Sequence, residues 1–200
     1  MPDSMSKTRR QFRTLRRNIK PPERISHARA IARHLMSAGL LLRSGVVAAY
    51  LANDKDGELD TAPLLARLWS MGKRVAVPVV FGTQSKMDFF EFKPQTPLVT
   101  NRFGIREPAP GSTYVNGRAL TIMLLPLVAF DDAGIRIGMG GGYYDRFLGN
   151  LPTELRPRLI GIAHEVQRCR QRLKSSPWDV PLDDVVTENG WHSFSPQHIQ

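Results

Sequence analysis

The sequence has very little cysteine: Cys169 is the only one among 200 residues. One thiol excludes an intrachain disulfide, a zinc site made of several cysteines and a Cys-x-x-Cys redox pair. No run of about eighteen apolar residues occurs, and the N-terminal stretch is charged, which argues against a transmembrane helix and a secretory signal. These absences predict a soluble, cytoplasmic protein.

Acidic residues are also scarce, because 18 Asp and Glu stand against 28 Lys and Arg, for a net charge of +10. The imbalance is local: residues 7–34 hold ten basic residues and a single acid, Glu23, so the rest of the chain is nearly neutral. A basic N-terminal segment suggests a nucleic-acid-binding module as one interpretation. The segment lacks the aromatic platforms typical of RNA binding, and we therefore expect no nucleic-acid partner.

The N-terminal segment has the pattern of two helices. Apolar residues recur at helical spacing in residues 7–20, with arginines on a neighbouring face, which predicts a basic amphipathic helix. Pro21 and Pro22 end it, and a second apolar stripe runs to a stop at Gly39. The expected apolar positions are Phe12, Leu15 and Ile19 in the first helix, and Ile25, Ala28, Ala32 and Leu35 in the second.

Residues 46–79 have the pattern of a strand, a helix and a strand. Residues 46–51 and 74–79 are rich in β-branched and apolar residues, and the helix between them has Asp60 or Thr61 as its cap. Such a unit joins parallel strands by a right-handed crossover. Residues 87–92, 120–125 and 158–163 read as further strands, and residues 93–117 as an irregular segment rich in Pro and Gly. We predict one α/β domain over residues 1–200, with three layers and a largely parallel, Rossmann-like sheet flanked by helices.

A cluster of glycines lies between the predicted strand at 120–125 and a predicted helix at 143–151. Gly138, Gly140, Gly141 and Gly142 let backbone N–H groups approach an anion and adopt positive φ. Arg136 adds a cation, and Asp145 in the first helical turn is placed to hold Mg²⁺ beside phosphates. The pattern is neither a Walker A loop nor a dinucleotide fingerprint. It predicts a phosphate-binding loop, with a flexible connector as the alternative.

The segment Gly140-Gly-Gly-Tyr-Tyr-Asp-Arg146, with Leu125-Pro-Leu-Val-Ala-Phe-Asp131 upstream, closely resembles the signature of the 5-formyltetrahydrofolate cyclo-ligase family. The resemblance implies ATP- and Mg²⁺-dependent conversion of 5-formyltetrahydrofolate, with or without a polyglutamate tail, to 5,10-methenyltetrahydrofolate. ADP and phosphate would be released, through phosphorylation of the formyl oxygen and ring closure by N10. We expect a monomer without a membrane partner. A family relative acting on another substrate is the remaining alternative.

The resemblance also implies roles for individual residues. The spacing of Arg9-Arg-Gln-Phe-Arg13 matches the family's Lys-x-x-Leu-Arg motif, with arginine in place of the lysine. The implied catalytic residues are Arg136 and Asp145. The implied ATP-binding residues are Arg9, Arg13, Arg136, Ile137, Gly138, Met139, Gly140, Gly141, Gly142, Tyr143 and Tyr144. The implied folate-binding residues are Arg13, Leu51, Glu58, Met139, Gly140, Gly141, Gly142 and Tyr143.

The implied metal ligands are Asp145 and Asp179. Asp179 lies in residues 178–186, which resemble the family's C-terminal Asp motif, and Asp183 and Asp184 in the same stretch are alternatives. His164 ends the predicted strand at 158–163, and we assign it no role, because a histidine in that position is more often simply hydrogen-bonded.

Overall fold

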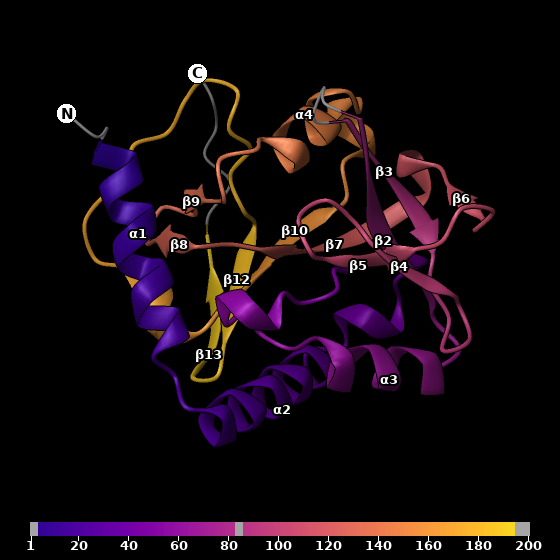
Figure 1. Cartoon of the computed structure of the whole chain (residues 1–200), viewed down its shortest axis with the longest axis horizontal. Helices are drawn as coiled ribbons and strands as arrows, with labels where there is room; N and C mark the ends of the chain where they lie inside the picture. The colour runs from indigo at the N-terminus through magenta and orange to yellow at the C-terminus, as the bar shows by residue number, and fades with distance from the viewer. Residues whose placement is uncertain (1–3, 83–85, 195–200) are drawn as a thin grey trace.

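An eight-stranded sheet lies at the centre of the computed structural model, which describes residues 4–82 and 86–194 (Figure 1). Its strands, in spatial order, are β13 (Gly190–Ser193), β12 (Asp184–Thr187), β10 (Arg158–Ile162), β7 (Leu120–Pro126), β1 (Val46–Ala48), β2 (Arg74–Phe81), β3 (Lys86–Glu91) and β6 (Tyr114–Val115). The five from β12 to β2 are mutually parallel, and antiparallel pairs form both edges. The predicted largely parallel sheet is confirmed.

Helices cover both faces of this sheet. The helices α2 (Pro21–Ser37) and α3 (Ala62–Ser70) lie along one face, and α4 (Tyr143–Gly149) lies on the other (Figure 1). Strand β1 shows how the sequence specifies the two faces, because successive side chains of a strand point in opposite directions. Val47 belongs to the apolar cluster that contains α2 and α3 residues, whereas Val46 and Ala48 belong to the cluster that contains Leu148 of α4. The three predicted layers are therefore present.

The β1–α3–β2 unit has the predicted parallel crossover, but β1 ends at Ala48 instead of residue 51. The Ala49 N–H still donates to the carbonyl of Ala76 in β2 at 2.8 Å, and beyond it the carbonyl of Tyr50 accepts from the Thr61 hydroxyl at 2.6 Å instead of from a strand. Of the two candidate caps of α3, Asp60 supplies the bond: its Oδ1 accepts from the Ala62 N–H at 2.9 Å. In α2, Ile25 is 54% exposed, so the buried stripe starts one turn later, at Ala28.

The prediction of an irregular segment over residues 93–117 was wrong in part. The segment contains β4 (Leu98–Thr100), which pairs antiparallel with β5 (Arg106–Pro108), and also the edge strand β6. The side chain of Asn101 stabilises the turn between β4 and β5, since its Oδ1 accepts from the backbone N–H groups of Phe103 and Ile105. Asparagine turn chemistry, rather than apolar periodicity, specifies this hairpin.

The basic N-terminal helix is α1 (Ser4–Arg17), and it packs on a small sheet of β11 (Arg168–Cys169), β8 (Ala129–Asp131) and β9 (Arg136–Ile137). Phe12 anchors it in an apolar cluster with residues of this sheet. The expected apolar face is partly wrong: Leu15 is 41% exposed, whereas Arg16 is only 2% exposed. Among the described residues, no helix is long and apolar enough to cross a membrane.

Candidate active site

The glycine loop, residues 138–142, connects β9 to α4. Gly140 has φ of +95° and Gly142 has φ of +62°, a left-handed region that side chains rarely adopt. A Cβ on Gly141 would lie 2.7 Å from the Tyr143 ring, so that position is closed to larger residues by contact rather than by φ. The loop therefore depends on glycine at three positions, and it exposes backbone at Gly140 and Gly141.

Two cations lie against this loop. The Nε of Arg9 donates to the carbonyl of Gly138 at 3.0 Å, and its guanidinium carbon is 3.4 Å from where a Cβ on Gly140 would be. Arg146 donates to the carbonyl of Gly141 from the other side. Met139 is 54% exposed beside them. Exposed backbone flanked by guanidinium groups is an arrangement suited to binding phosphate oxygens.

Arg136 and Asp145 are joined directly. Arg136 donates to Asp145 Oδ1 at 2.6 Å and also to the carbonyl of Val180, and the Val180 N–H donates to the same Oδ1 at 3.2 Å. The Arg136 side chain is 6% exposed and that of Asp145 is 22% exposed. This network holds β9, α4 and the segment around residue 180 together, so Asp179 lies in the segment that contacts Asp145.

The two alternatives to Asp179 have other partners. One carboxylate oxygen of Asp183 accepts from the Leu159 N–H at 2.7 Å, and Asp184 is fully buried in a two-bond ion pair with Arg158. Both acids thus stabilise the pairing of β10 with β12. Asp179 accepts from the Ser176 N–H through Oδ2 at 2.7 Å. The geometry favours Asp179 among the three, and its role as a metal ligand stays a prediction.

Asp56 is a central residue that the sequence pattern did not reveal. It lies in the turn after β1 and accepts hydrogen bonds from Arg13, Arg16 and Arg17 of α1. Burial acts to raise the pKa of Asp56, but the three guanidinium groups outweigh it and hold that pKa below the ordinary value. The missed signal is the near absence of acids in residues 7–34, since a buried arginine needs a carboxylate from elsewhere.

Arg13 therefore contacts Asp56 and not the glycine loop, in contrast to Arg9. Its side chain is 34% exposed and pairs with Asp56 at 2.9 Å. Arg16, to which the sequence pattern assigns no site role, is the buried member: it donates to the carbonyls of Asp56 and Leu127 and lies 3.9 Å from Glu58. The implied contacts of Arg13 with ATP and folate stay predictions.

Glu58 lies in the interior of this region, on the loop after β1. Its Oε2 accepts from the Asn53 N–H at 3.0 Å, and burial raises its pKa above the ordinary value. Burial, and then the nearby charge of Glu58, also raise the pKa values of the Tyr50 and Tyr144 hydroxyls. The charge of Glu58 thus acts on Tyr144, which follows the glycine loop. The Leu51 side chain is half-buried and packs against the apolar cluster that contains α2 and α3 residues.

The remaining implied residues lie along the same segment. Ile137 is a buried member of β9, and Tyr143 opens α4 with its hydroxyl accepting from Arg102 at 3.1 Å. The glycine loop, Arg9 and the Arg136–Asp145 pair form one connected region, and the charge of Glu58 acts on it at Tyr144. It lies beyond the carboxyl ends of β1 and β7, where ligands of parallel α/β sheets bind.

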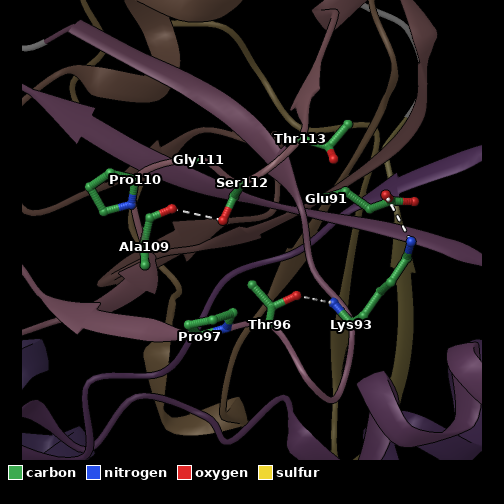
Figure 2. A pocket seen from close by; sticks show the side chains of 9 residues that line it. All are labelled: Glu91, Lys93, Thr96, Pro97, Ala109, Pro110, Gly111, Ser112 and Thr113. Carbon is green, nitrogen blue, oxygen red and sulfur yellow. Dashed lines mark hydrogen bonds and ion pairs between the residues drawn. The ribbon is translucent and has the colours of Figure 1, made fainter.

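A separate open depression of about 280 Å³ lies near the end of β3 (Figure 2). The residues lining it are Glu91, Lys93, Thr96, Pro97, Ala109, Pro110, Gly111, Ser112 and Thr113. None of them is a predicted site residue, and Glu91 and Lys93 there form an ion pair at 3.1 Å. The candidate active site is elsewhere, at the glycine loop.

Comparison with known proteins identifies the family. The sequence profile of the 5-formyltetrahydrofolate cyclo-ligase family matches residues 2–188. The chain is 38% identical over 178 residues to the 5-formyltetrahydrofolate cyclo-ligase of Escherichia coli K12, covering 88% of this chain and 96% of that protein. The Haemophilus influenzae enzyme of the same name is 34% identical over 181 residues, covering 89% and 94% of the two chains.

Solved structures show the same fold. The Aquifex aeolicus 5,10-methenyltetrahydrofolate synthetase superimposes with a TM-score of 0.75 at 29% identity, covering 98% of this chain and 99% of that one. The Mycoplasma pneumoniae synthetase gives a TM-score of 0.73 at 23% identity, covering 93% and 99%. Given these matches along nearly the whole length, the chain belongs to the 5-formyltetrahydrofolate cyclo-ligase family.

Proposed function

We propose that the protein converts 5-formyltetrahydrofolate to 5,10-methenyltetrahydrofolate with ATP, releasing ADP and phosphate. Family membership supports this reaction, and the observation that carries it is the contact of Arg9 with the exposed glycine loop. That contact provides a cation beside the exposed backbone of Gly140 and Gly141, which suits the phosphates of ATP. The competing nucleic-acid interpretation has less support, because four arginines of α1 contact Asp56 or the glycine loop.

The proposed reaction has two steps. First, the formyl oxygen attacks the γ-phosphorus of ATP, and ADP leaves with the electrons of the broken P–O bond. N10 then attacks the activated formyl carbon and loses its proton, the ring closes, and the C–O bond breaks as phosphate leaves. Neither step needs a nucleophile from the protein, since phosphoryl transfer depends mainly on alignment and on neutralisation of charge.

The residues around the glycine loop would align ATP. Arg9 and the loop backbone would contact phosphate oxygens, with Arg13, Ile137, Tyr143 and Tyr144 around them. Arg136, buried beside the loop, would set the position of Asp145 through their ion pair. Arginine at position 9, in place of the family's lysine, offers a planar fork of donors, which suits two phosphate oxygens at once.

The residues also fit Mg²⁺, which we include in the proposal. The described hydrogen bonds of Asp145 use Oδ1, and those of Asp179 use Oδ2, so each carboxylate keeps a second oxygen. Mg²⁺ takes one or two carboxylates together with phosphate oxygens and water. When bound, the ion would neutralise the phosphate charge.

The proposal also covers the state of the protein and its substrate. The protein would act as a monomer in the cytoplasm, on folate with or without a polyglutamate tail.

The folate would bind next to the loop, on the side of Glu58. Leu51 offers an apolar surface, and Met139 is exposed at the glycine loop. Glu58 offers a carboxylate that can accept from the donor edge of a pterin, and Tyr143, Arg13 and the glycine backbone complete this set. Placing the formyl group beside the γ-phosphate would make its oxygen the nucleophile.

An assay with purified protein tests the proposed function directly. With Mg²⁺, ATP and 5-formyltetrahydrofolate, we expect methenyl product, followed by its absorbance, and one ADP for each product formed. Omission of ATP is the control, and it should give no product. A folded sample that forms no methenyl product with any nucleoside triphosphate would show the assignment to be wrong.

Replacing Glu58 with glutamine tests the folate site. The amide keeps an oxygen for the Asn53 N–H and loses the charge, so we expect KM for the folate to rise more than KM for ATP. Because the pKa of Glu58 is raised on folding, its charge is unfavourable in the folded protein at neutral pH. At pH 7 the free energy of unfolding of Glu58→Gln should therefore be no lower than that of the wild type. The wild type should become more stable relative to the variant only as the pH falls towards 4.5. Equal increases in both KM values would instead indicate a structural role.

A further inference from the structure

Two histidines and a glutamate that have no part in the proposed reaction come together at one edge of α2. His27 lies in α2. His164 lies two residues after the end of β10, and Glu188 lies in the turn between β12 and β13. One ligand atom from each lies within 4.8 Å of the other two. His27 and His164 are 137 positions apart along the chain, and His164 and Glu188 are 24 positions apart, so only the fold brings them together.

The distances match the edges of a small coordination sphere. The Nδ1 atoms of His27 and His164 are 2.9 Å apart, and His27 Nδ1 is 3.5 Å from Glu188 Oε1. Around a tetrahedral zinc ion with bonds of about 2.0–2.1 Å, neighbouring ligand atoms are roughly 3.3 Å apart. These two distances bracket that value, and the ligand atoms of His164 and Glu188 lie within 4.8 Å of each other, so shifts of the side chains would create the site.

The surrounding groups orient these ligands. Glu188 accepts from the Glu165 N–H through Oε2 at 3.0 Å, which leaves Oε1 on the side of His27. The backbone N–H of His164 is held by the Gln167 side chain at 2.9 Å. Hydrogen bonds of this kind to ligating groups fix their position and raise metal affinity. The carboxylate and the loop of His164 are thus set in place before an ion arrives.

His164 is the fully buried member of the three, and it offers Nδ1 to the cluster, the atom that lies 2.9 Å from His27 Nδ1. Histidine binds Zn²⁺ through an unprotonated ring nitrogen, so the proton of the Nδ1–Nδ1 hydrogen bond would be released or would move to an Nε2 atom when an ion binds.

Charge and access also permit a cation. Glu188 contributes a negative charge, and the charge of the nearby Arg16 is neutralised by its ion pair with Asp56. The His27 and Glu188 side chains are 21% and 15% exposed, so an ion can enter from solvent. Two imidazoles favour Zn²⁺ and related transition metals over Mg²⁺, which prefers oxygen ligands.

We propose that His27, His164 and Glu188 form a binding site for a divalent transition-metal ion of the zinc class, with a water molecule as fourth ligand. The ion would connect α2 to the chain segments that follow β10 and β12. Its role is to stabilise the packing of α2 on the sheet, independently of the Mg²⁺ that accompanies ATP. This proposal does not depend on the folate reaction.

Zinc titration of the full-length protein tests the site. After dialysis against EDTA and then metal-free buffer, calorimetry with ZnCl₂ should show one equivalent bound. His27→Gln and Glu188→Gln should each weaken binding by at least about tenfold. At a hundredfold excess over Kd, zinc should raise the Tm of the wild type by roughly 5–10 °C, and it should not raise that of His27→Gln.

His192→Gln is the matched control. His192 is also 21% exposed and lies beside a glutamate, 3.1 Å from Glu165, but the described residues offer no third ligand there. It should bind zinc as the wild type does. Co²⁺ in place of Zn²⁺ should give the strong visible absorption of a tetrahedral site in the wild type and in His192→Gln, but not in His27→Gln.

Three outcomes would overturn the proposal. The first is absence of zinc binding to the folded wild type. The second is unchanged zinc affinity in both His27→Gln and Glu188→Gln. The third is a loss in His192→Gln as large as in those two variants, which would place the ion at another surface pair. The side chains of His27 and Glu188 are both partly exposed. Circular dichroism of each variant checks that it is folded before titration.

Discussion

Replacing Asp56 with alanine is expected to lower the free energy of unfolding by about 3–5 kcal/mol, the usual cost of removing one partner from a buried ion pair. Three guanidinium groups converge on this carboxylate, and that of Arg16 is almost fully buried. Without Asp56, Arg16 would keep only the carbonyl bonds and the more distant Glu58 as partners. An unpaired buried cation is far more costly than the lost attraction alone.

Urea denaturation followed by fluorescence measures this loss. Asp54→Ala is the matched control, because Asp54 lies in the same turn with an exposed side chain. Since the pKa of Asp56 is lowered on folding, its contribution is present above the unfolded value of 3.8 and is lost as the pH falls below it. The difference between wild type and Asp56→Ala should therefore persist at neutral pH and shrink below pH 3.8. Equal urea midpoints for Asp56→Ala and Asp54→Ala would refute a central role for Asp56.

Replacing Asp145 with asparagine is expected to reduce turnover by about 10²–10³-fold, the usual cost of removing one preorganised electrostatic group from an active site. Asparagine keeps an oxygen that can accept from Arg136 and from the Val180 N–H, so the network around α4 can persist. What it removes is the negative charge that would hold Mg²⁺ beside the phosphates. A loss of turnover with little change in stability is thus the expected signature.

The control for Asp145→Asn is Asp132→Asn. Asp132 also pairs with an arginine, Arg168, at 2.7 Å, but its side chain is 60% exposed and lies outside the candidate site. Turnover at saturating substrates and Tm should be measured for both variants, together with ATP affinity as a function of Mg²⁺ concentration. If Asp145→Asn is folded and as active as Asp132→Asn, Asp145 is neither a catalytic residue nor a metal ligand.

The parts of the fold that follow from local pattern were predictable from sequence. The apolar runs in β7 and β10 and the crossover around α3 specify parallel strands, and the structure has them. Local pattern misplaced Leu15, which lies on the solvent side of α1 while Arg16 is buried. Hydrophobic spacing assigns arginine to the surface, and only a carboxylate 40 positions away reverses that assignment. Such long-range ion pairs leave no periodic signal.

The same distinction applies to the candidate site. The glycine loop and Asp145 are neighbours in sequence, so their juxtaposition is predictable from the sequence alone. The contacts of Arg9 with Gly138 and of Val180 with Asp145 span 129 and 35 positions, and composition says nothing about them. His164 illustrates the limit most clearly. In the sequence it is a histidine at the end of a strand, and only the fold places His27 and Glu188 beside it.

The partners of α1 all lie later in the chain, which has a consequence for biosynthesis. Arg16 bonds to Asp56 and Leu127, Arg9 contacts Gly138, and Phe12 packs with Leu173. Because synthesis proceeds from the N-terminus, α1 leaves the ribosome before the segments that it contacts, and it is among the last elements to complete its packing. The proposed ATP site is therefore incomplete until the glycine loop and the segment around residue 180 have been translated.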